Sequence, residues 1–157
     1  MNKEEKYRIL RIIRGTTVDG PGFRTAIYMA GCSHHCPGCH NPQSWNFNAG
    51  EEMSLREIMK VIKEEDFDVT LTGGDPMCSP QTTLRLAKAI KNAGYGIWIY
   101  TGYLFEEIQK SAELRPILDY VDVVVDGPYE EKNRNTDLKF RGSSNQRIMT
   151  SQGVFLT

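Results

Sequence analysis

Apolar and amphipathic segments alternate along this chain. Four apolar segments, each bounded by glycine or polar residues, are typical of buried strands: 25–30, 69–72, 97–100 and 121–125. Apolar residues at helical spacing predict a helix that begins at Leu55 after a capping-box sequence, a second over 80–92, and a third over 104–118 that breaks near Pro116. A looser alternation over 7–14 fits an edge strand.

This alternation of strands and helices predicts parallel strands joined by right-handed crossovers. A complete barrel of eight such units needs about 250 residues, whereas this chain has 157. We therefore expect an α/β fold in which about six parallel strands form a partial, open barrel. A single domain over 1–157 is the expected organisation, because a chain of this length buries a core without disulfides.

Polar, glycine-rich segments follow each of the four predicted strands. A segment at 31–40, which we call the cysteine loop, follows the first strand, and 73–75, 101–102 and 126–127 follow the others. The carboxyl ends of parallel strands lie at one edge of a sheet, where such folds place their active sites. We expect these segments to meet in one cleft.

The cysteine loop carries Cys32, Cys36 and Cys39, three of the four cysteines of the chain. Three thiolates on one short loop suit an iron–sulfur cluster, whose irons prefer soft sulfur ligands. Because the loop has no fourth cysteine, one iron would keep an open coordination position, where a small molecule can bind.

Other uses of the cysteines remain open at this point. The four cysteines allow two disulfides, and His34, His35 and His40 each supply a fourth ligand for a zinc site. The second half of a common structural zinc pattern does not follow, however. We expect Cys78 to be a small thiol beside a proline turn; a bond from it to the cluster would remove the open iron.

Charge gives no indication of a nucleic-acid or membrane partner. The chain has 19 basic and 20 acidic residues, interspersed, for a net charge of −1, so no long-range field favours polyanions. No apolar run has the length of a signal peptide or a membrane span. The sequence predicts a cytoplasmic protein.

The Cys-x3-Cys-x2-Cys spacing at Cys32, Cys36 and Cys39 resembles the signature of the radical S-adenosylmethionine superfamily. Within it, the chain is similar to the activases of glycyl-radical enzymes, and most of all to those of anaerobic ribonucleoside-triphosphate reductase. The resemblance runs from about 13 to 148 and includes further matching segments: 18–24, 40–45, 72–76, 125–129 and 140–147.

The resemblance implies a fold of the radical S-adenosylmethionine type and one 4Fe-4S cluster on Cys32, Cys36 and Cys39. It also implies that S-adenosyl-L-methionine chelates the open iron. The residues implied to bind this cofactor are Gly38, Cys39, His40, Gly73, Gly74, Asp75 and Thr101. Asp75 stands where the superfamily more commonly has glutamate, and its side chain is one methylene shorter. We therefore expect backbone groups of Gly73 and Gly74 to contribute more to binding of the cofactor than the carboxylate does. No catalytic residue is implied beyond the cluster and its cofactor.

The implied activity is that of a radical S-adenosylmethionine oxidoreductase working without oxygen. Reductive cleavage of the cofactor yields a 5'-deoxyadenosyl radical, which takes a hydrogen from a glycine of the partner. That partner is the large subunit of anaerobic ribonucleoside-triphosphate reductase, and a flavodoxin-like or ferredoxin-like protein donates the electron. Neither nucleic acid nor membrane is an expected partner.

Other functions fit parts of the same pattern. They are an activase of another glycyl-radical enzyme such as pyruvate formate-lyase, a small-molecule enzyme as in deazapurine biosynthesis, and a non-catalytic metal or electron-transfer module. The tail, about 130–157, is polar and holds Arg134, Lys139, Arg141 and Arg147. It is either a solvated loop or a segment that faces the cleft or the partner.

Overall fold

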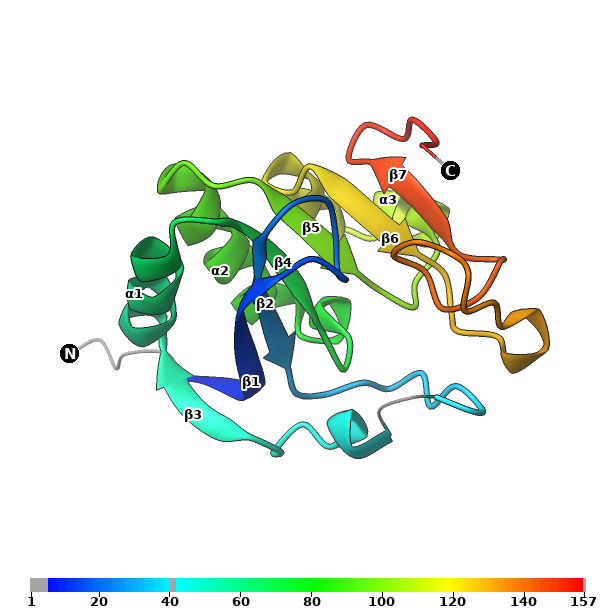
Figure 1. Ribbon diagram of the computed structural model, residues 1–157, viewed down its shortest axis with the longest axis horizontal. Helices are drawn as coiled ribbons and strands as arrows, with labels where there is room; N and C mark the ends of the chain where they lie inside the picture. The colour runs from blue at the N-terminus through cyan, green and yellow to red at the C-terminus, as the bar shows by residue number, and fades with distance from the viewer. Residues whose placement is uncertain (1–5, 40–41, 157) are drawn as a thin grey trace.

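One seven-stranded sheet organises residues 6–39 and 42–156, which are the residues that the computed structural model describes (Figure 1). Its strands, in order across the sheet, are β3 (Glu51–Ser54), β1 (Lys6–Thr16), β2 (Arg24–Met29), β4 (Asp68–Gly73), β5 (Ile97–Tyr100), β6 (Val123–Asp126) and β7 (Arg147–Thr150). The α-helices are α1 (Leu55–Glu65), α2 (Pro80–Asn92) and α3 (Phe105–Lys110). Single turns of 3-10 helix are η1 (Pro42–Trp45), η2 (Pro76–Cys78), η3 (Arg115–Asp119) and η4 (Glu131–Asn133).

The expected partial, open barrel of about six parallel strands is wrong, because the sheet is mixed. β2, β4, β5 and β6 pair in parallel, whereas β1 pairs antiparallel with β2 and β3, and β7 pairs antiparallel with β6. Residues 17–23 join β1 to β2 and are too few for a parallel crossover, which takes about a dozen residues or more. The pattern of apolar residues located the central strands and indicated β1 through the alternation over 7–14, but it carried no signal for β3, for β7 or for the antiparallel pairing.

Helix α1 begins where its sequence predicts. The Ser54 hydroxyl accepts a hydrogen bond from Glu57 N over 3.1 Å, and Ser54 N donates to the Glu57 carboxylate over 3.2 Å. Such an N-cap contributes about 1 kcal/mol. Asp66 ends the helix in the left-handed conformation, with φ of 58°. The predicted third helix is shorter than expected, since α3 stops at Lys110 and Pro116 lies in η3.

The two faces of the sheet are covered differently. Val124 packs with residues of α1, α2 and α3 in the main core. Val123 and Val125 pack with Ile148 and Trp98 on the opposite face. Alternate residues of a strand point to opposite faces, which accounts for this division within β6. In the described ranges, no helix is long and apolar enough to cross a membrane.

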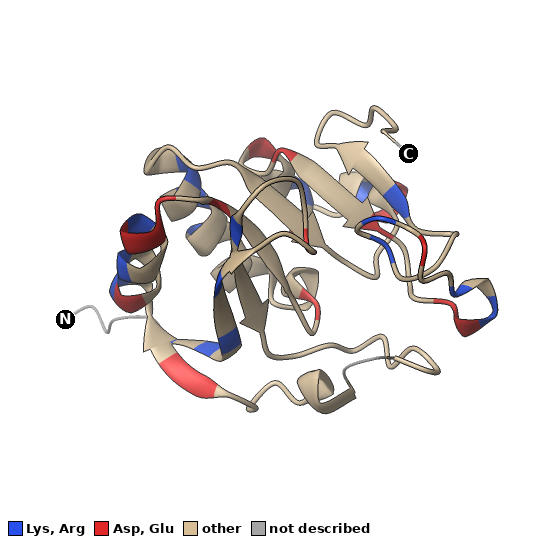
Figure 2. Ribbon diagram, in the orientation of Figure 1, with Lys and Arg blue, Asp and Glu red and all other residues tan. Residues whose placement is uncertain are grey.

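Charged residues lie on both ends of the molecule, and Figure 2 shows acidic and basic positions side by side on α1. The cysteine loop contains no Asp, Glu, Lys or Arg. The side chains that this loop itself offers are therefore thiols, imidazoles and a hydroxyl.

Candidate functional site

The cysteine loop starts where β2 ends, beside the end of β4. Met29 pairs with Gly73 at the last position of the β2–β4 register, so the loop and Gly74 leave the sheet together. Gly74 N donates to Met29 O over 2.7 Å, and Asp75 N donates to Gly31 O over 2.8 Å. These backbone bonds fix the first residues of the cysteine loop against the segment that follows β4.

The two glycines after β4 are required by this close approach. A Cβ on Gly73, whose φ is +112°, would lie 2.3 Å from Met29 N, and a Cβ on Gly74 would lie 2.5 Å from Gly31 O. Real Cβ atoms do not come so close to backbone atoms. Both positions therefore have a structural requirement for glycine, whatever else they contact.

The start of the loop also contacts η1. Gly31 N donates to Ser44 O over 2.8 Å and Cys32 N donates to Trp45 O over 3.2 Å. The His35 ring stacks on Trp45, with ring centroids 4.4 Å apart. The first half of the loop is thus held between η1 and the segment after β4.

The three cysteines of the loop line one cavity of about 140 Å³. The predicted site residues Gly74, Asp75 and Thr101 line it too, and they come from the ends of β4 and β5. An adjoining cavity of about 490 Å³ shares His34, Cys36, Gly102 and Tyr129 with it. The polar segments therefore converge at the carboxyl ends of the parallel strands.

Two of the predicted cofactor-binding residues do not line this cavity, and a third cannot be placed. Gly38 and Gly73 are not among the residues that line this cavity. A Cβ on Gly38 would lie 2.6 Å from the Glu131 carboxylate. His40 lies outside the described residues.

Asp75 is the centre of a buried hydrogen-bond network. Its Oδ2 accepts from His34 Nε2 over 2.6 Å, from Thr101 Oγ1 over 2.9 Å and from Gly102 N over 2.8 Å. Its Oδ1 accepts from Met77 N over 2.9 Å. With the side chain 2% exposed, the carboxylate is fully used in joining the cysteine loop, β4 and β5.

This network shifts the titration of both partners. Burial raises the pKa of Asp75, and the hydrogen bond from His34 acts against that rise. Hydrogen bonds to Asp75, and secondarily to Cys78, raise the pKa of His34 to about 10. The imidazolium–carboxylate pair is the form that this arrangement favours.

Gly102 and Gly127 line the cavity, as the segments after the predicted strands led us to expect. Three further lining residues were not predicted as site residues: Tyr100, Tyr129 and Gln146. Tyr129 and Gln146 lie within segments that matched the family, whereas Tyr100 had no such signal. The Tyr100 hydroxyl is buried with no hydrogen-bond partner in the part of the chain that the structure describes. Burial also raises the pKa of this phenol.

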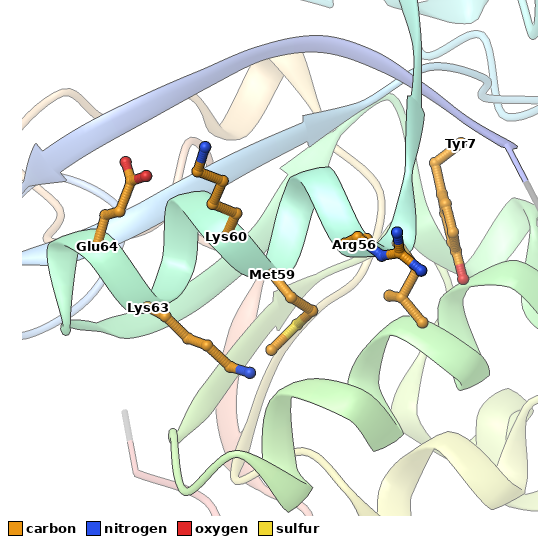
Figure 3. Close-up of a pocket in the computed structure, with 7 residues that line it drawn as sticks. Tyr7, Arg56, Met59, Lys60, Lys63 and Glu64 are labelled. Atoms are coloured by element: carbon orange, nitrogen blue, oxygen red, sulfur yellow. The ribbon is translucent and has the colours of Figure 1, made fainter.

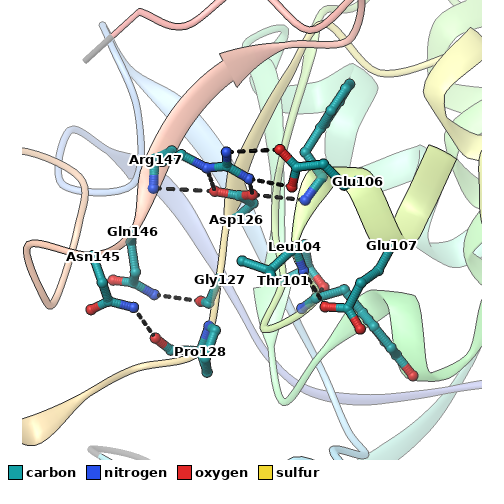
Figure 4. A network of polar contacts seen from close by, with 12 residues as sticks. Thr101, Leu104, Glu106, Glu107, Asp126, Gly127, Pro128, Asn145, Gln146 and Arg147 are labelled. Carbon is teal, nitrogen blue, oxygen red and sulfur yellow. Dashed lines mark hydrogen bonds and ion pairs between the residues drawn. The ribbon is translucent and has the colours of Figure 1, made fainter.

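Gln146 brings the tail to the cavity. Its Nε2 donates to Gly127 O over 3.1 Å, and its Oε1 accepts from Gly142 N over 2.8 Å and from Ser143 N over 3.1 Å. Asn145 Nδ2 donates to Pro128 O over 2.8 Å (Figure 4). Two adjacent amide side chains thus attach the tail to the segment after β6.

A network of ion pairs next to these amides also holds the tail (Figure 4). Arg147 binds the fully buried Asp126 carboxylate through Nε, over 3.1 Å, and also through Nη2. It also binds Glu106 through two hydrogen bonds of 2.9 and 2.7 Å. Asp126 Oδ2 accepts from Phe105 N over 2.7 Å. β6, β7 and α3 are therefore joined at Asp126, the residue before Gly127.

Cys78 lies close to the cysteine loop but faces another cavity. Its Sγ is 3.4 Å from Ser33 Oγ, and it lines a space of about 360 Å³ with Ser33, Met77 and Tyr103. Hydrogen bonds, the strongest from Cys32, lower the pKa of Cys78 to about 3, and the same contact raises the pKa of Cys32.

A larger cavity of about 840 Å³ lies along α1, lined by Tyr7, Leu55, Arg56, Met59, Lys60, Lys63 and Glu64 (Figure 3). It shares no residue with the cysteine-lined cavity. It offers no thiol or imidazole, so size alone does not make it the reactive site. We place the candidate site at the smaller cavity, where the sulfur ligands meet.

Comparisons with known proteins agree with the cysteine pattern. A family model described as a 4Fe-4S single cluster domain matches residues 18–149. A protein of Pasteurella multocida (strain Pm70) is 35% identical over 142 residues, covering 83% of this chain and 89% of that protein. One of Enterobacteria phage T4 is 36% identical over 143 residues, covering 85% and 88%. One of Vibrio cholerae serotype O1 is 33% identical over 158 residues, covering 94% and 97%. All three are called anaerobic ribonucleoside-triphosphate reductase-activating protein.

Proposed function

Because this chain belongs to the family of anaerobic ribonucleoside-triphosphate reductase-activating proteins, we propose that it is the enzyme that installs a glycyl radical on that reductase. The cysteine-lined cavity is the proposed reaction site. The observation that carries the proposal is the meeting of three thiols with the ends of β4 and β5 in one cavity.

Cys32, Cys36 and Cys39 are the proposed ligands of a 4Fe-4S cluster. Their side chains are half-buried and come from one loop without formal charge, and thiolates are the ligands that such clusters take. The remaining cysteine, Cys78, lines a separate cavity, although its sulfur lies within 4.8 Å of that of Cys32. The three cysteines of the loop fit a cluster with three protein ligands and one open iron, and Cys78 is not one of the proposed ligands.

S-adenosyl-L-methionine is the proposed ligand of the open iron. Gly74 and Gly102 line the cavity, and their backbone groups are the proposed contacts of the cofactor. The Asp75 carboxylate has no free acceptor site, and we therefore assign it a positioning role for His34 and Thr101. Tyr100 supports a polar ligand, because its buried hydroxyl lacks a partner among the described residues.

When bound there, the cluster supplies the electron that cleaves S-adenosyl-L-methionine into methionine and a 5'-deoxyadenosyl radical, which removes a hydrogen atom from a glycine of the reductase. The chain itself contributes the cavity walls and the loop that carries the three thiols. Tyr129, just before the tail, and Gln146 of the tail line the cavity, and the glycine-bearing segment of the partner is proposed to enter beside them. A flavodoxin-like or ferredoxin-like donor remains our expectation for the electron.

The test is the iron content and the electron paramagnetic resonance spectrum of the anaerobically reconstituted, reduced full chain, with and without S-adenosyl-L-methionine. We expect about four irons per chain and a spectrum that changes when the cofactor is added. Cys36→Ala should lose the cluster, whereas Cys78→Ala, the matched control, should keep it. A cluster whose spectrum ignores the cofactor would point instead to an electron-transfer module.

A further inference from the structure

Three metal-ligating side chains meet in a combination other than the three cysteines of the loop. Cys32, His34 and Cys78 each offer a ligand atom, and these atoms all lie within 4.8 Å of one another. We propose that in the cluster-free chain these three residues bind one soft divalent cation, with zinc as the test case. The ligands of this ion site and those of the proposed cluster site have only Cys32 in common.

The spacing of the three donor atoms suits a single ion. Bonds of about 2.3 Å to sulfur and about 2.0 Å to nitrogen, in a tetrahedron, separate the ligand atoms by roughly 3.5–3.8 Å. The observed upper limit of 4.8 Å leaves only a small closure of the side chains. A cubane cluster binds its thiolates to different irons and so holds them farther apart.

The histidine of this group is already oriented as a metal ligand. His34 Nε2 binds Asp75 Oδ2 over 2.6 Å, so Nδ1 is the ring nitrogen left for a metal. A carboxylate that holds the other ring nitrogen is the usual support of a metal-binding histidine. Asp75 is itself fixed by Thr101 and Gly102, which makes this support rigid.

The ion has an approach that does not pass through the cysteine-lined cavity. Cys78 and Ser33 line the neighbouring space of about 360 Å³, and Cys32, His34 and Cys78 are all half-buried rather than sealed. Two thiolates and one imidazole are ligands that zinc accepts, and a water completes the tetrahedron. Any proton still on Cys32, on Cys78 or on Nδ1 of His34 goes to solvent when the ion binds.

Sharing of Cys32 makes the two sites mutually exclusive, a consequence that rests on the proposed function. An ion held by Cys32, His34 and Cys78 removes one of the three cluster ligands. The chain therefore holds either one divalent ion or the cluster, and zinc should slow cluster assembly on the wild-type chain.

The experiment is an anaerobic titration of the reduced, cluster-free full chain with Co²⁺, followed by displacement with Zn²⁺. We expect one Co²⁺ per chain, with the absorption of thiolate-to-cobalt charge transfer and of tetrahedral cobalt, and its replacement by one Zn²⁺. Cys78→Ser and His34→Ala should each weaken binding at least tenfold. Asp75→Asn, which keeps all three ligands, should weaken it about 10- to 100-fold, and circular dichroism verifies that each variant is folded.

Cys36→Ser and Cys39→Ser are the matched controls, and both should bind Co²⁺ as the wild type does. The proposal is overturned if either control loses Co²⁺ as Cys78→Ser does, since the ion would then sit on the cysteine loop alone, or if the wild type takes up no Co²⁺. Reconstitution with iron tests the proposed function independently of the ion site. Cys78→Ser should assemble the cluster normally, and failure of the wild type to assemble any cluster would contradict the proposed function while leaving the cobalt result intact.

Discussion

His34 donates a hydrogen bond through Nε2 to Asp75 Oδ2 over 2.6 Å, which connects the cysteine loop to the end of β4. The same oxygen accepts from Thr101 and Gly102 at the end of β5. A single buried carboxylate thus sets the relative positions of the cysteine loop and two strand ends.

Replacing Asp75 by asparagine should destabilise the chain, because an amide oxygen cannot accept all the hydrogen bonds that the two carboxylate oxygens accept. Leaving buried donors unpaired costs about 1–3 kcal/mol. The measurement is the free energy of unfolding of the cluster-free chain in denaturant. Asp137→Asn, at an exposed position, serves as the control and should change it little; equal effects of the two variants would refute the role given to Asp75.

Substitution of Gly74 by alanine should prevent stable cluster binding. Its Cβ would lie 2.5 Å from Gly31 O, so the cysteine loop must move away from β4, at a cost of about 1–3 kcal/mol. Iron per chain after reconstitution is the readout. Gly94→Ala is the comparison, because Gly94 has φ of +95° but open space around it. That variant should lose stability and keep its iron, and iron retained by Gly74→Ala would contradict the packing argument.

The two tyrosines on the strand ends should respond oppositely to loss of the hydroxyl. Tyr28 donates to Asp19 over 2.9 Å, so Tyr28→Phe should lower the free energy of unfolding by about 1 kcal/mol. Tyr100 has no partner among the described residues, so Tyr100→Phe should leave it unchanged or raise it. If the phenol serves a ligand, Tyr100→Phe should also weaken binding of S-adenosyl-L-methionine, measured by calorimetry. A large loss of stability in Tyr100→Phe would mean that its hydroxyl is bonded after all.

The ion pair between Arg147 and Glu106 should make stability depend on pH in the acid range. Hydrogen bonds from Arg147 lower the pKa of Glu106 from 4.5 to about 2. Since the pKa is lower in the folded chain, the stabilisation is complete above pH 4.5 and is lost as the pH falls towards 2. The effect should stay below about 1 kcal/mol, because the Glu106 side chain is 52% exposed.

This dependence is measured as the free energy of unfolding of the wild type minus that of Glu106→Gln, from pH 6 down to about pH 2. The difference should shrink as the pH falls. Glu113→Gln, at an exposed position, should give a difference that does not vary in this way. A difference that grows on acidification would reverse the assigned sign.

Local signals predicted the central strands and the start of α1, because each depends on neighbours in the sequence. The Ser54–Glu57 cap and the apolar run in β6 are examples. β1 was indicated as an edge strand, whereas β7 was missed, since it is a short strand within a polar tail and its pairing with β6 depends on residues far apart in the sequence. The meeting of the cysteine loop with the segments after the strands could be predicted, because the carboxyl ends of parallel strands share one edge of a sheet. The hydrogen-bond partners of Asp75 could not be predicted. Nothing near Asp75 in the sequence indicates that His34 and Thr101 would occupy its carboxylate.

The central claim is that this chain generates a glycyl radical on anaerobic ribonucleoside-triphosphate reductase. The most direct test incubates the reduced, cluster-loaded chain with that reductase and S-adenosyl-L-methionine without oxygen, and records the organic radical by electron paramagnetic resonance. We expect a glycyl radical on the reductase together with methionine and 5'-deoxyadenosine in matching amounts, and none of these with Cys36→Ala. A fully loaded cluster that yields neither the radical nor the cleavage products would contradict the account.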